Sequence, residues 1–207
     1  DLPTPRTFSV SGTAVLGDKA SDSAIDQSFG LADSAAGGVT ATSTSRLTQP
    51  AARASSALDG DPTTAWQTAI ENPRSSIHVV LPTATALDHL NLQVVADGRH
   101  SVPARVEITA DDGTTRDVKL PAIPVRAPSG VVSVPVSFDA LSGQGFTVAI
   151  TGLRQVQRSA RVMPIGIAEL GVPGVVRPPL PAQLPASCIP ALVTIDGRPF
   201  PVRISGS

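Results

Sequence analysis

Short runs in which apolar and polar residues alternate dominate the middle of the chain. Leu90, Leu92 and Val94 alternate with Asn91 and Gln93, and residues 104–110 repeat the pattern. A period of two places one set of side chains on each face of a β-strand. Runs of this kind, each bounded by turn residues, predict strands at 39–44, 76–81, 89–96, 104–110, 115–120, 131–138, 145–151 and 165–172.

The turns between these runs favour an antiparallel arrangement. Asp111, Asp112 and Gly113 separate two predicted strands, and an Asp-Gly pair is a common hairpin turn. No segment shows a convincing amphipathic helix. About eight short strands without helices predict an all-β fold, an antiparallel β-sandwich spanning residues 39–174.

The two flanks are expected to belong to other units. Residues 1–38 contain one predicted strand, 7–16, followed by a small and polar stretch typical of a linker or long loop. Residues 175–187 are rich in proline and predict a semi-extended linker. In 188–207, strands at 192–195 and 200–204 around Asp196 and Gly197 predict one β-hairpin of a following unit.

Composition narrows the class of partner. The 207 residues carry 16 Lys and Arg against 17 Asp and Glu, and only 16% of residues are charged. Such a balance argues against a nucleic-acid or anionic-membrane surface. With 3% aromatic residues, including one tryptophan and no tyrosine, the core must consist mainly of aliphatic side chains, and few rings remain for stacking on sugars.

Several features bear on the setting of the chain. The apolar runs are much shorter than the roughly 20 residues that span a bilayer, so no direct membrane insertion is expected. No secretory signal opens the chain, and its start at Asp1 and end at Ser207 suggest a segment of a larger protein. Cys188 is the single cysteine; it is either a small buried hydrophobe or the partner of a cysteine elsewhere in the parent protein.

An acidic loop lies between the first two predicted strands of the sandwich. Residues 59–64, Asp-Gly-Asp-Pro-Thr-Thr, combine two carboxylates, a flexible glycine and two hydroxyl groups. Hard cations such as calcium prefer oxygen ligands of this kind. Taken alone, however, an Asp-Gly loop is more often an ordinary turn, and the spacing differs from that of an EF-hand loop.

Residues 54–61, Ala-Ser-Ser-Ala-Leu-Asp-Gly-Asp, followed by Thr-Ala-Trp at 64–66, resemble the opening motif of the coagulation factor 5/8 type C, or discoidin, family. Residues 165–172, Ile-Gly-Ile-Ala-Glu-Leu-Gly-Val, are similar to its closing strand. The resemblance implies a galactose-binding-like jelly-roll sandwich with a structural Ca²⁺ between the loop and the last strand, and Trp66 in the core. By the same resemblance, the metal ligands would be Ala57, Asp59, Asp61, Thr64, Ala168 and Glu169.

The order of the units also resembles the C-terminal extracytoplasmic region of the mycobacterial membrane arabinofuranosyltransferases, most closely those of type D. This resemblance implies a membrane-anchored glycosyltransferase as the parent protein, neighbouring domains of that protein as partners, and a location on the periplasmic or cell-wall side. The catalytic site would then lie in a part of the parent outside this segment.

Discoidin-like modules bind ligands through loops at one end of the sandwich. Three loops, 67–74, 97–101 and 154–161, are the candidates here, and none contains tryptophan or tyrosine. Their polar side chains could bind sugar hydroxyl groups, although solvated loop residues are the simpler explanation. The candidate ligand-binding residues are Arg99, His100, Arg154, Gln157 and Arg158.

No catalytic motif appears. His78 and His89 lie in or beside predicted strands without a nucleophile motif, and nothing places Glu71 and Glu107 as a glycosidase pair. We therefore expect no catalytic residues in this segment. The leading hypothesis is a non-catalytic carbohydrate-binding module for arabinan or another cell-wall glycan. The alternative is a structural or protein-interaction module that packs on neighbouring domains without binding sugar.

Overall fold

A computed structural model describes residues 17, 19–70, 72–158, 160–175, 181, 183–186 and 188–206. The predicted strand at 7–16 and most of the proline-rich linker lie outside these ranges. The helical elements are α1 (Asp22–Ser28) and three 3₁₀ turns, η1 (Ser34–Ala36), η2 (Pro50–Ala52) and η3 (Ala54–Ala57). The strands are β1 (Thr40–Ser43), β2 (Trp66–Gln67), β3 (Ser76–Asp97), β4 (Val102–Ala110), β5 (Thr115–Lys119), β6 (Arg126–Arg154), β7 (Gln157–Arg158), β8 (Arg161–Val162), β9 (Gly166–Glu169), β10 (Cys188–Ile195) and β11 (Arg198–Arg203).

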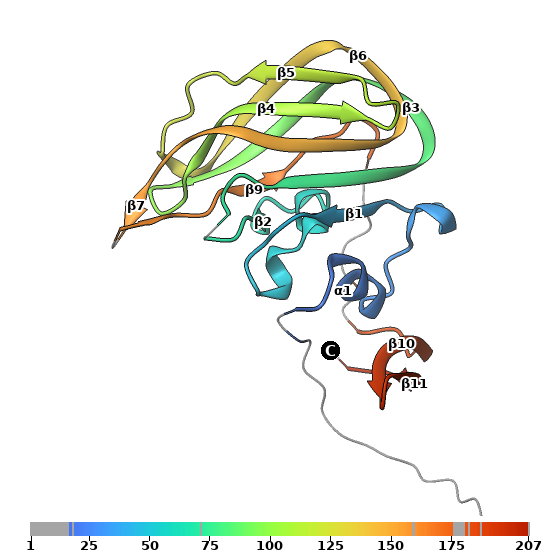
Figure 1. Ribbon diagram of the computed structural model, residues 1–207. Helices are drawn as coiled ribbons and strands as arrows, with labels where there is room; N and C mark the ends of the chain where they lie inside the picture. The colour runs from blue at the N-terminus through green and yellow to red at the C-terminus, as the bar shows by residue number, and fades with distance from the viewer. Residues whose placement is uncertain are drawn as a thin grey trace, which may run out of the picture.

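The predicted antiparallel β-sandwich is confirmed. Within the described residues, seven strands form one hydrogen-bonded sheet in the order β2-β9-β3-β6-β4-β5, with β1 beside β3. The first half of β3 pairs with β1 and with the second half of β6. That part of β6 also pairs with β4, and β4 pairs with β5. The second half of β3 pairs with the first half of β6 and with β9. The sheet therefore folds over itself into two layers (Figure 1).

Two strands are longer than the sequence pattern predicts. The strands expected at 76–81 and 89–96 are two parts of β3, and those expected at 131–138 and 145–151 are two parts of β6. Between these parts the strands turn from one layer to the other, and their pairing shifts register near Thr85 and Gly143. Proline and glycine usually interrupt a strand, so Pro82 and Gly143 favoured two short strands in each case. The bends of β3 and β6 pair with each other, and this pairing keeps both strands extended.

The core lies between the two layers and is mainly aliphatic, as the composition predicts. Trp66 is the largest buried side chain and is 1% exposed, which confirms its predicted place in the core. The hairpin expected at Asp111–Gly113 is confirmed as well, because β4 and β5 pair antiparallel on either side of it and Gly113 has a φ of 82°. No helix among the described residues is long and apolar enough to cross a membrane.

The segment before the sandwich contains a helix where a linker or long loop was expected. Ser21 caps α1 by accepting a hydrogen bond from the Ala24 N–H. Helix α1 lies beside β1 and the 3₁₀ turn η3 (Figure 1). Two of its aspartates are buried and paired with arginines of the sandwich: Asp22 lies 2.8 Å from Arg46, and Asp26 lies 2.9 Å from Arg53. The helix is therefore packed on the sandwich through buried ion pairs.

The end of the described chain forms the predicted hairpin, because β10 and β11 pair antiparallel around Asp196 and Gly197. Cys188 at the start of β10 is exposed. The interpretation of Cys188 as a small buried hydrophobe is therefore wrong: it begins the strand of a two-stranded ribbon, which has too little surface to bury it.

Candidate functional site

The acidic loop follows directly from a tight 3₁₀ turn. η3 ends at Ala57, and Gly60 adopts a φ of 75°, a conformation that costs glycine little. Asp59 Oδ1 accepts a hydrogen bond from the Asp61 N–H at 3.0 Å, and the Thr64 hydroxyl lies 2.9 and 2.8 Å from the two Asp59 carboxylate oxygens. The loop therefore fixes the carboxylate of Asp59 by its own contacts.

The side-chain carboxylate and the backbone carbonyl of Asp61 have different hydrogen-bond partners. Its carboxylate accepts hydrogen bonds from the Thr63 hydroxyl at 2.6 Å and the Thr63 N–H at 2.9 Å, which together lower the pKa of Asp61. Its backbone carbonyl accepts from the Thr64 hydroxyl at 3.1 Å. The carbonyl of Asp61, and not its carboxylate, therefore faces the same hydroxyl as Asp59.

The last strand of the sandwich brings a third acidic side chain to this loop. Glu169 ends β9 and is 8% exposed. Burial, then the negative charge of Asp59, raises its pKa from 4.5 to about 7, against an opposing hydrogen bond from the Gly60 backbone. Its Oε1 is buried without a hydrogen-bond partner. A buried, unpaired carboxylate oxygen beside a second carboxylate is the arrangement that a bound cation would stabilise.

The two alanines predicted as ligands lie at the same junction. The Leu170 N–H donates to the Ala57 carbonyl at 2.8 Å, which ties η3 to the residue after β9. Ala168 precedes Glu169 and is fully buried. Five of the six predicted ligands thus come together from η3, the loop and β9, and Ala168 is adjacent to one of them in the chain. They fit a calcium ion as a mixed set of carboxylate, hydroxyl and carbonyl oxygens.

A cation bound by the predicted ligands would be coordinated by backbone and hydroxyl oxygens as well as by carboxylates. Among the described residues, no three His, Cys, Asp or Glu side chains form a group that could hold a metal ion by themselves. The ligand set implied by the family resemblance already includes Thr64 and two alanines, and an alanine can contribute only its backbone carbonyl. The arrangement is therefore a candidate for an oxygen-ligated cation and not for zinc, which prefers nitrogen and sulfur ligands.

A separate polar cluster lies where β3 ends and β4 begins. The His100 ring is held on both sides: Nδ1 lies 3.0 Å from Asp97 Oδ1, and Nε2 lies 3.2 Å from Gln67 Oε1. Asp97 also accepts hydrogen bonds from the backbone N–H groups of Arg99 and His100 at 2.7 and 3.0 Å. Burial would raise the pKa of Asp97, but the hydrogen bonds from His100 and Arg99 outweigh it, so its pKa is lowered.

The third candidate loop is anchored to this cluster. The Ser101 hydroxyl donates to the Met163 carbonyl at 2.7 Å and accepts from the Val156 N–H at 3.0 Å. These bonds fix both ends of the hairpin formed by β7 and β8. The three candidate residues of this region, Arg154, Gln157 and Arg158, are exposed. The structure therefore brings all five predicted ligand-binding residues to one end of the sandwich.

The two candidate sites lie at opposite ends of β9. Gly166 pairs with Gln67 and packs near His100, whereas Glu169 lies at the acidic loop. Three residues of strand span about 10 Å. The cation loop and the polar cluster are thus distinct sites on one short strand.

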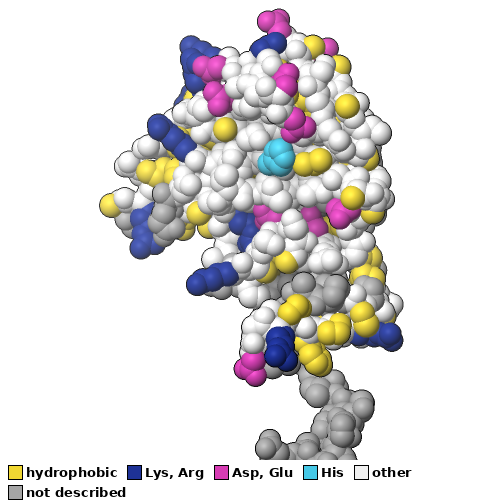
Figure 2. Space-filling view, turned by 45° about the vertical axis from the view of Figure 1, so that its right-hand side comes forward, with side chains coloured by type: hydrophobic (Ala, Val, Ile, Leu, Met, Phe, Trp, Pro, Cys, Tyr) yellow, Lys and Arg dark blue, Asp and Glu magenta, His cyan; other side chains and the backbone are white. Residues whose placement is uncertain are grey.

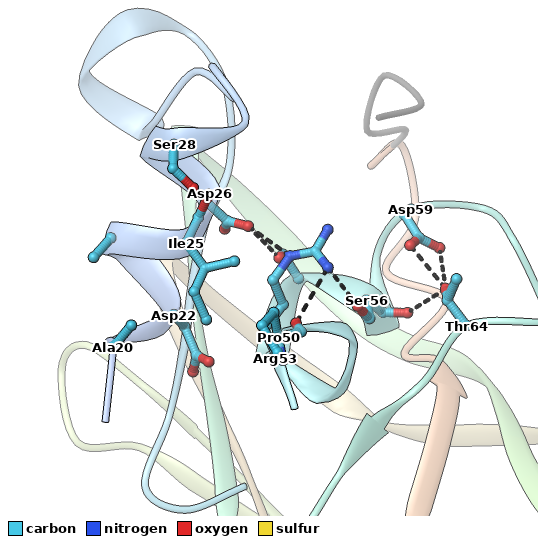
Figure 3. Close-up of polar contacts among 12 residues, drawn as sticks. Ala20, Asp22, Ile25, Asp26, Ser28, Pro50, Arg53, Ser56, Asp59 and Thr64 are labelled. Carbon is cyan, nitrogen blue, oxygen red and sulfur yellow. Dashed lines mark hydrogen bonds and ion pairs between the residues drawn. The ribbon is translucent and has the colours of Figure 1, made fainter. Parts of the chain in front are cut away.

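Sequence reasoning missed two residues that position the acidic loop. Arg53 bonds to Asp26 of α1 and donates from Nη1 to the Ser56 hydroxyl at 3.1 Å. The Ser56 carbonyl in turn lies 3.3 Å from the Thr64 hydroxyl. Figure 3 shows this path from α1 to Asp59. Arg53 directly precedes the quoted motif and Ser56 lies within it. Neither carries a metal-ligand signal, so only the fold indicates their role.

Solved structures resemble the chain weakly. The family 32 carbohydrate-binding module of C. perfringens NanJ, solved with galactose, is 22% identical over 65% of this chain and 92% of its own, with a TM-score of 0.47. Chitosan-binding module 2 of Paenibacillus sp. IK-5 is 16% identical over 65% of this chain and 95% of its own, with a TM-score of 0.45. Arabinofuranosyltransferase AftD from Mycobacteria is 18% identical over 70% of this chain and 12% of its own, with a TM-score of 0.46. These values are too low to identify a ligand.

No curated protein matches the chain. A family model, described as the third carbohydrate-binding module of arabinofuranosyltransferase D, matches residues 36–183. The matched range encloses the whole sandwich, the acidic loop and the polar cluster. The family describes a non-catalytic binding module of a glycosyltransferase, in agreement with the expectation that this segment lacks a catalytic site. The chain therefore belongs to the family of the third carbohydrate-binding module of arabinofuranosyltransferase D.

Proposed function

We propose that the polar end of the sandwich binds arabinan or a related cell-wall glycan and holds it near an attached arabinofuranosyltransferase. The observation that carries the proposal is the clustering of His100, Gln67 and Asp97 beside the exposed side chains of Arg154 and Arg158. Such groups offer several hydrogen-bond donors and acceptors for sugar hydroxyls. Tethering would raise the local concentration of acceptor glycan at the enzyme, on the extracytoplasmic side of the membrane.

Titration with arabinan oligosaccharides, followed by NMR, tests this proposal. We expect amide shifts at Gln67, Arg99, His100 and the β7–β8 hairpin. His100→Ala should weaken binding, because it removes both ring nitrogens from the cluster. His89→Ala is the matched control, because His89 is exposed on β3 beside Asp88, away from these loops. Shifts confined to other regions, or none at all, would contradict the proposal.

The rival function is that of a structural module that packs on neighbouring domains. It is favoured by the lack of tryptophan and tyrosine in the three loops, and by the burial of Trp66, which leaves the cluster without a stacking ring. Under this alternative, Arg158→Ala would disturb assembly with the parent protein, and glycan affinity would stay unmeasurable for both the original and the changed chain.

We propose further that the acidic loop and Glu169 hold a structural Ca²⁺. The unpaired Glu169 Oε1 and its proximity to Asp59 support this assignment. A cation bound only by the folded state raises its stability, so calcium should raise the melting temperature and a chelator should lower it. Asp59→Ala should abolish this response. A full calcium response in that variant would exclude the proposed ligands.

A further inference from the structure

The near-zero net charge of the chain conceals a separation of charge along the sandwich. At the end where β4 finishes and β3 and β6 bend lie the acidic residues Asp88, Asp111, Asp112 and Asp139. Figure 2, with this end turned forward, shows acidic side chains and a histidine facing the viewer on the sandwich, while Lys and Arg side chains of the sandwich lie along its top and left-hand edge, some of them beside acidic ones.

The opposite end, which carries the polar cluster, is basic. It bears Lys119 at the end of β5, Arg126 and Arg154 at the two ends of β6, Arg99 after β3, and Arg158 and Arg161 in the β7–β8 hairpin. All six side chains are exposed. Among the described residues, no carboxylate lies within ion-pair distance of any of them.

The aspartates close to this end already form hydrogen bonds or an ion pair with other partners. Asp97 accepts its hydrogen bonds from His100 and the adjoining backbone, and Asp117 pairs with Arg105. Their negative charge is therefore partly compensated by fixed local partners, and the six basic side chains retain a net positive field. Such a field attracts an anionic group and falls off with salt.

Two of these cations border a hollow. A cavity of about 200 Å³ lies beside the polar cluster, lined by Val102, Pro103, Leu120 and Pro121, together with Lys119 and Arg154. Val102 and Leu120 are buried, whereas both cations are exposed. An apolar floor suits the C–H face of a sugar ring, and two cations at the border suit a carboxylate or phosphate attached to it.

We infer that this end of the module selects an acidic glycan, and that Lys119 and Arg154 bind its anionic group while the ring lies in the adjoining hollow. This inference rests on the proposed carbohydrate-binding function. Because arabinan itself is uncharged, it names a cell-wall glycan with an acidic substituent, and not plain arabinan, as the preferred ligand. Guanidinium and ammonium groups here contribute selectivity for the charged sugar over its neutral equivalent.

The test compares two probes with the same sugar backbone, a charged oligogalacturonate and its uncharged, fully methyl-esterified form, by titration calorimetry on the full chain. At about 20 mM salt the acidic probe should bind about tenfold more tightly, and its advantage should largely disappear at about 300 mM, where the Debye length is short. The esterified probe should show little salt dependence.

Paired variants locate the effect. Lys119→Ala with Arg154→Ala should weaken binding of the acidic probe about tenfold more than binding of the esterified probe, because Arg154 also offers hydrogen bonds to uncharged sugar hydroxyls. Lys19→Ala with Arg203→Ala removes the same charge far from the hollow and is the control. Equal weakening in both double variants would overturn the inference, because the effect would then depend on overall charge alone.

The remaining outcomes separate this inference from the proposed function. Equal, salt-independent binding of both probes would refute acidic selectivity while leaving carbohydrate binding intact. Binding of neither probe nor arabinan would refute both. Vesicles containing an anionic lipid form a third arm: if they bind and the acidic probe does not, the basic end recognises a lipid surface, and the inference is wrong.

Discussion

Glu169 provides a direct test of the electrostatics at the acidic loop. Its pKa is raised from 4.5 to about 7 by burial and by the charge of Asp59. A raised folded-state pKa means that ionisation costs the native state more than the unfolded state. In calcium-free buffer, the contribution of Glu169 to the free energy of unfolding should therefore be fully present below pH 4.5, and it should be lost as the pH rises through about 7.

The size of the effect follows from the shift. At about 1.4 kcal/mol per pKa unit, the loss between pH 4.5 and pH 8 is at most about 3 kcal/mol. For a chain of this size, that corresponds to roughly 6–12 °C in melting temperature. Glu169→Gln removes the titrating group, so its stability relative to the original chain should rise by this amount between the two pH values.

The measurement is urea unfolding in EDTA at pH 4.5 and pH 8 for the original chain, Glu169→Gln and Glu107→Gln. Glu107 lies half-buried on β4 and provides the same substitution at another position. At pH 8, calcium should restore the original chain and have little effect on Glu169→Gln. If the difference between the original chain and Glu169→Gln is the same at both pH values, Glu169 does not have the raised pKa.

Three further substitutions test the packing that holds the site. Gly171→Ala should destabilise the fold by about 2–3 kcal/mol or more in urea unfolding, because residue 171 has a φ of 61° and an added Cβ would collide with the Asn91 carbonyl. Gly113→Ala is the control: residue 113 also has a positive φ but has open space around it, so this substitution should cost only about 1 kcal/mol. Trp66→Ala should cost about 3–5 kcal/mol by the same assay, and a cost below 1 kcal/mol would show that its burial contributes little. Asp26→Ala should cost about 3–5 kcal/mol, because it leaves Arg53 buried without its carboxylate; Asp26→Leu with Arg53→Met should recover part of that loss, and no recovery would contradict this explanation.

The sequence predicted the sandwich well, because its strands have one buried and one exposed face. Val106 and Ile108 are buried while Arg105 is exposed, so the alternation in the sequence corresponds to the buried and exposed faces of the strand. The bends of β3 and β6 were not predictable in the same way. At Pro82 and Gly143 the local sequence indicates a break, and only the pairing between the bends keeps the chain extended.

Helix α1 was missed for a different reason. Its buried face includes Ile25, but also Asp22 and Asp26, and a hydrophobic pattern cannot show that aspartates face inward. Their burial depends on Arg46 and Arg53, which lie more than 20 residues further along the chain. Long-range ion pairs of this kind leave no periodic signal, so the expectation of a linker was reasonable from the sequence and wrong in the fold.

The path from α1 to the acidic loop connects the helix to both candidate sites. Asp26 holds Arg53, Arg53 donates to Ser56, and the Ser56 carbonyl lies beside the Thr64 hydroxyl that contacts Asp59. The same 3₁₀ turn carries the Ala57 carbonyl, which is bound to the end of β9. Since β9 pairs at its other end with Gln67 of the polar cluster, loosening α1 would act on both sites through one short strand. The candidate cation loop and the polar cluster therefore both depend on residues that lie before the sandwich.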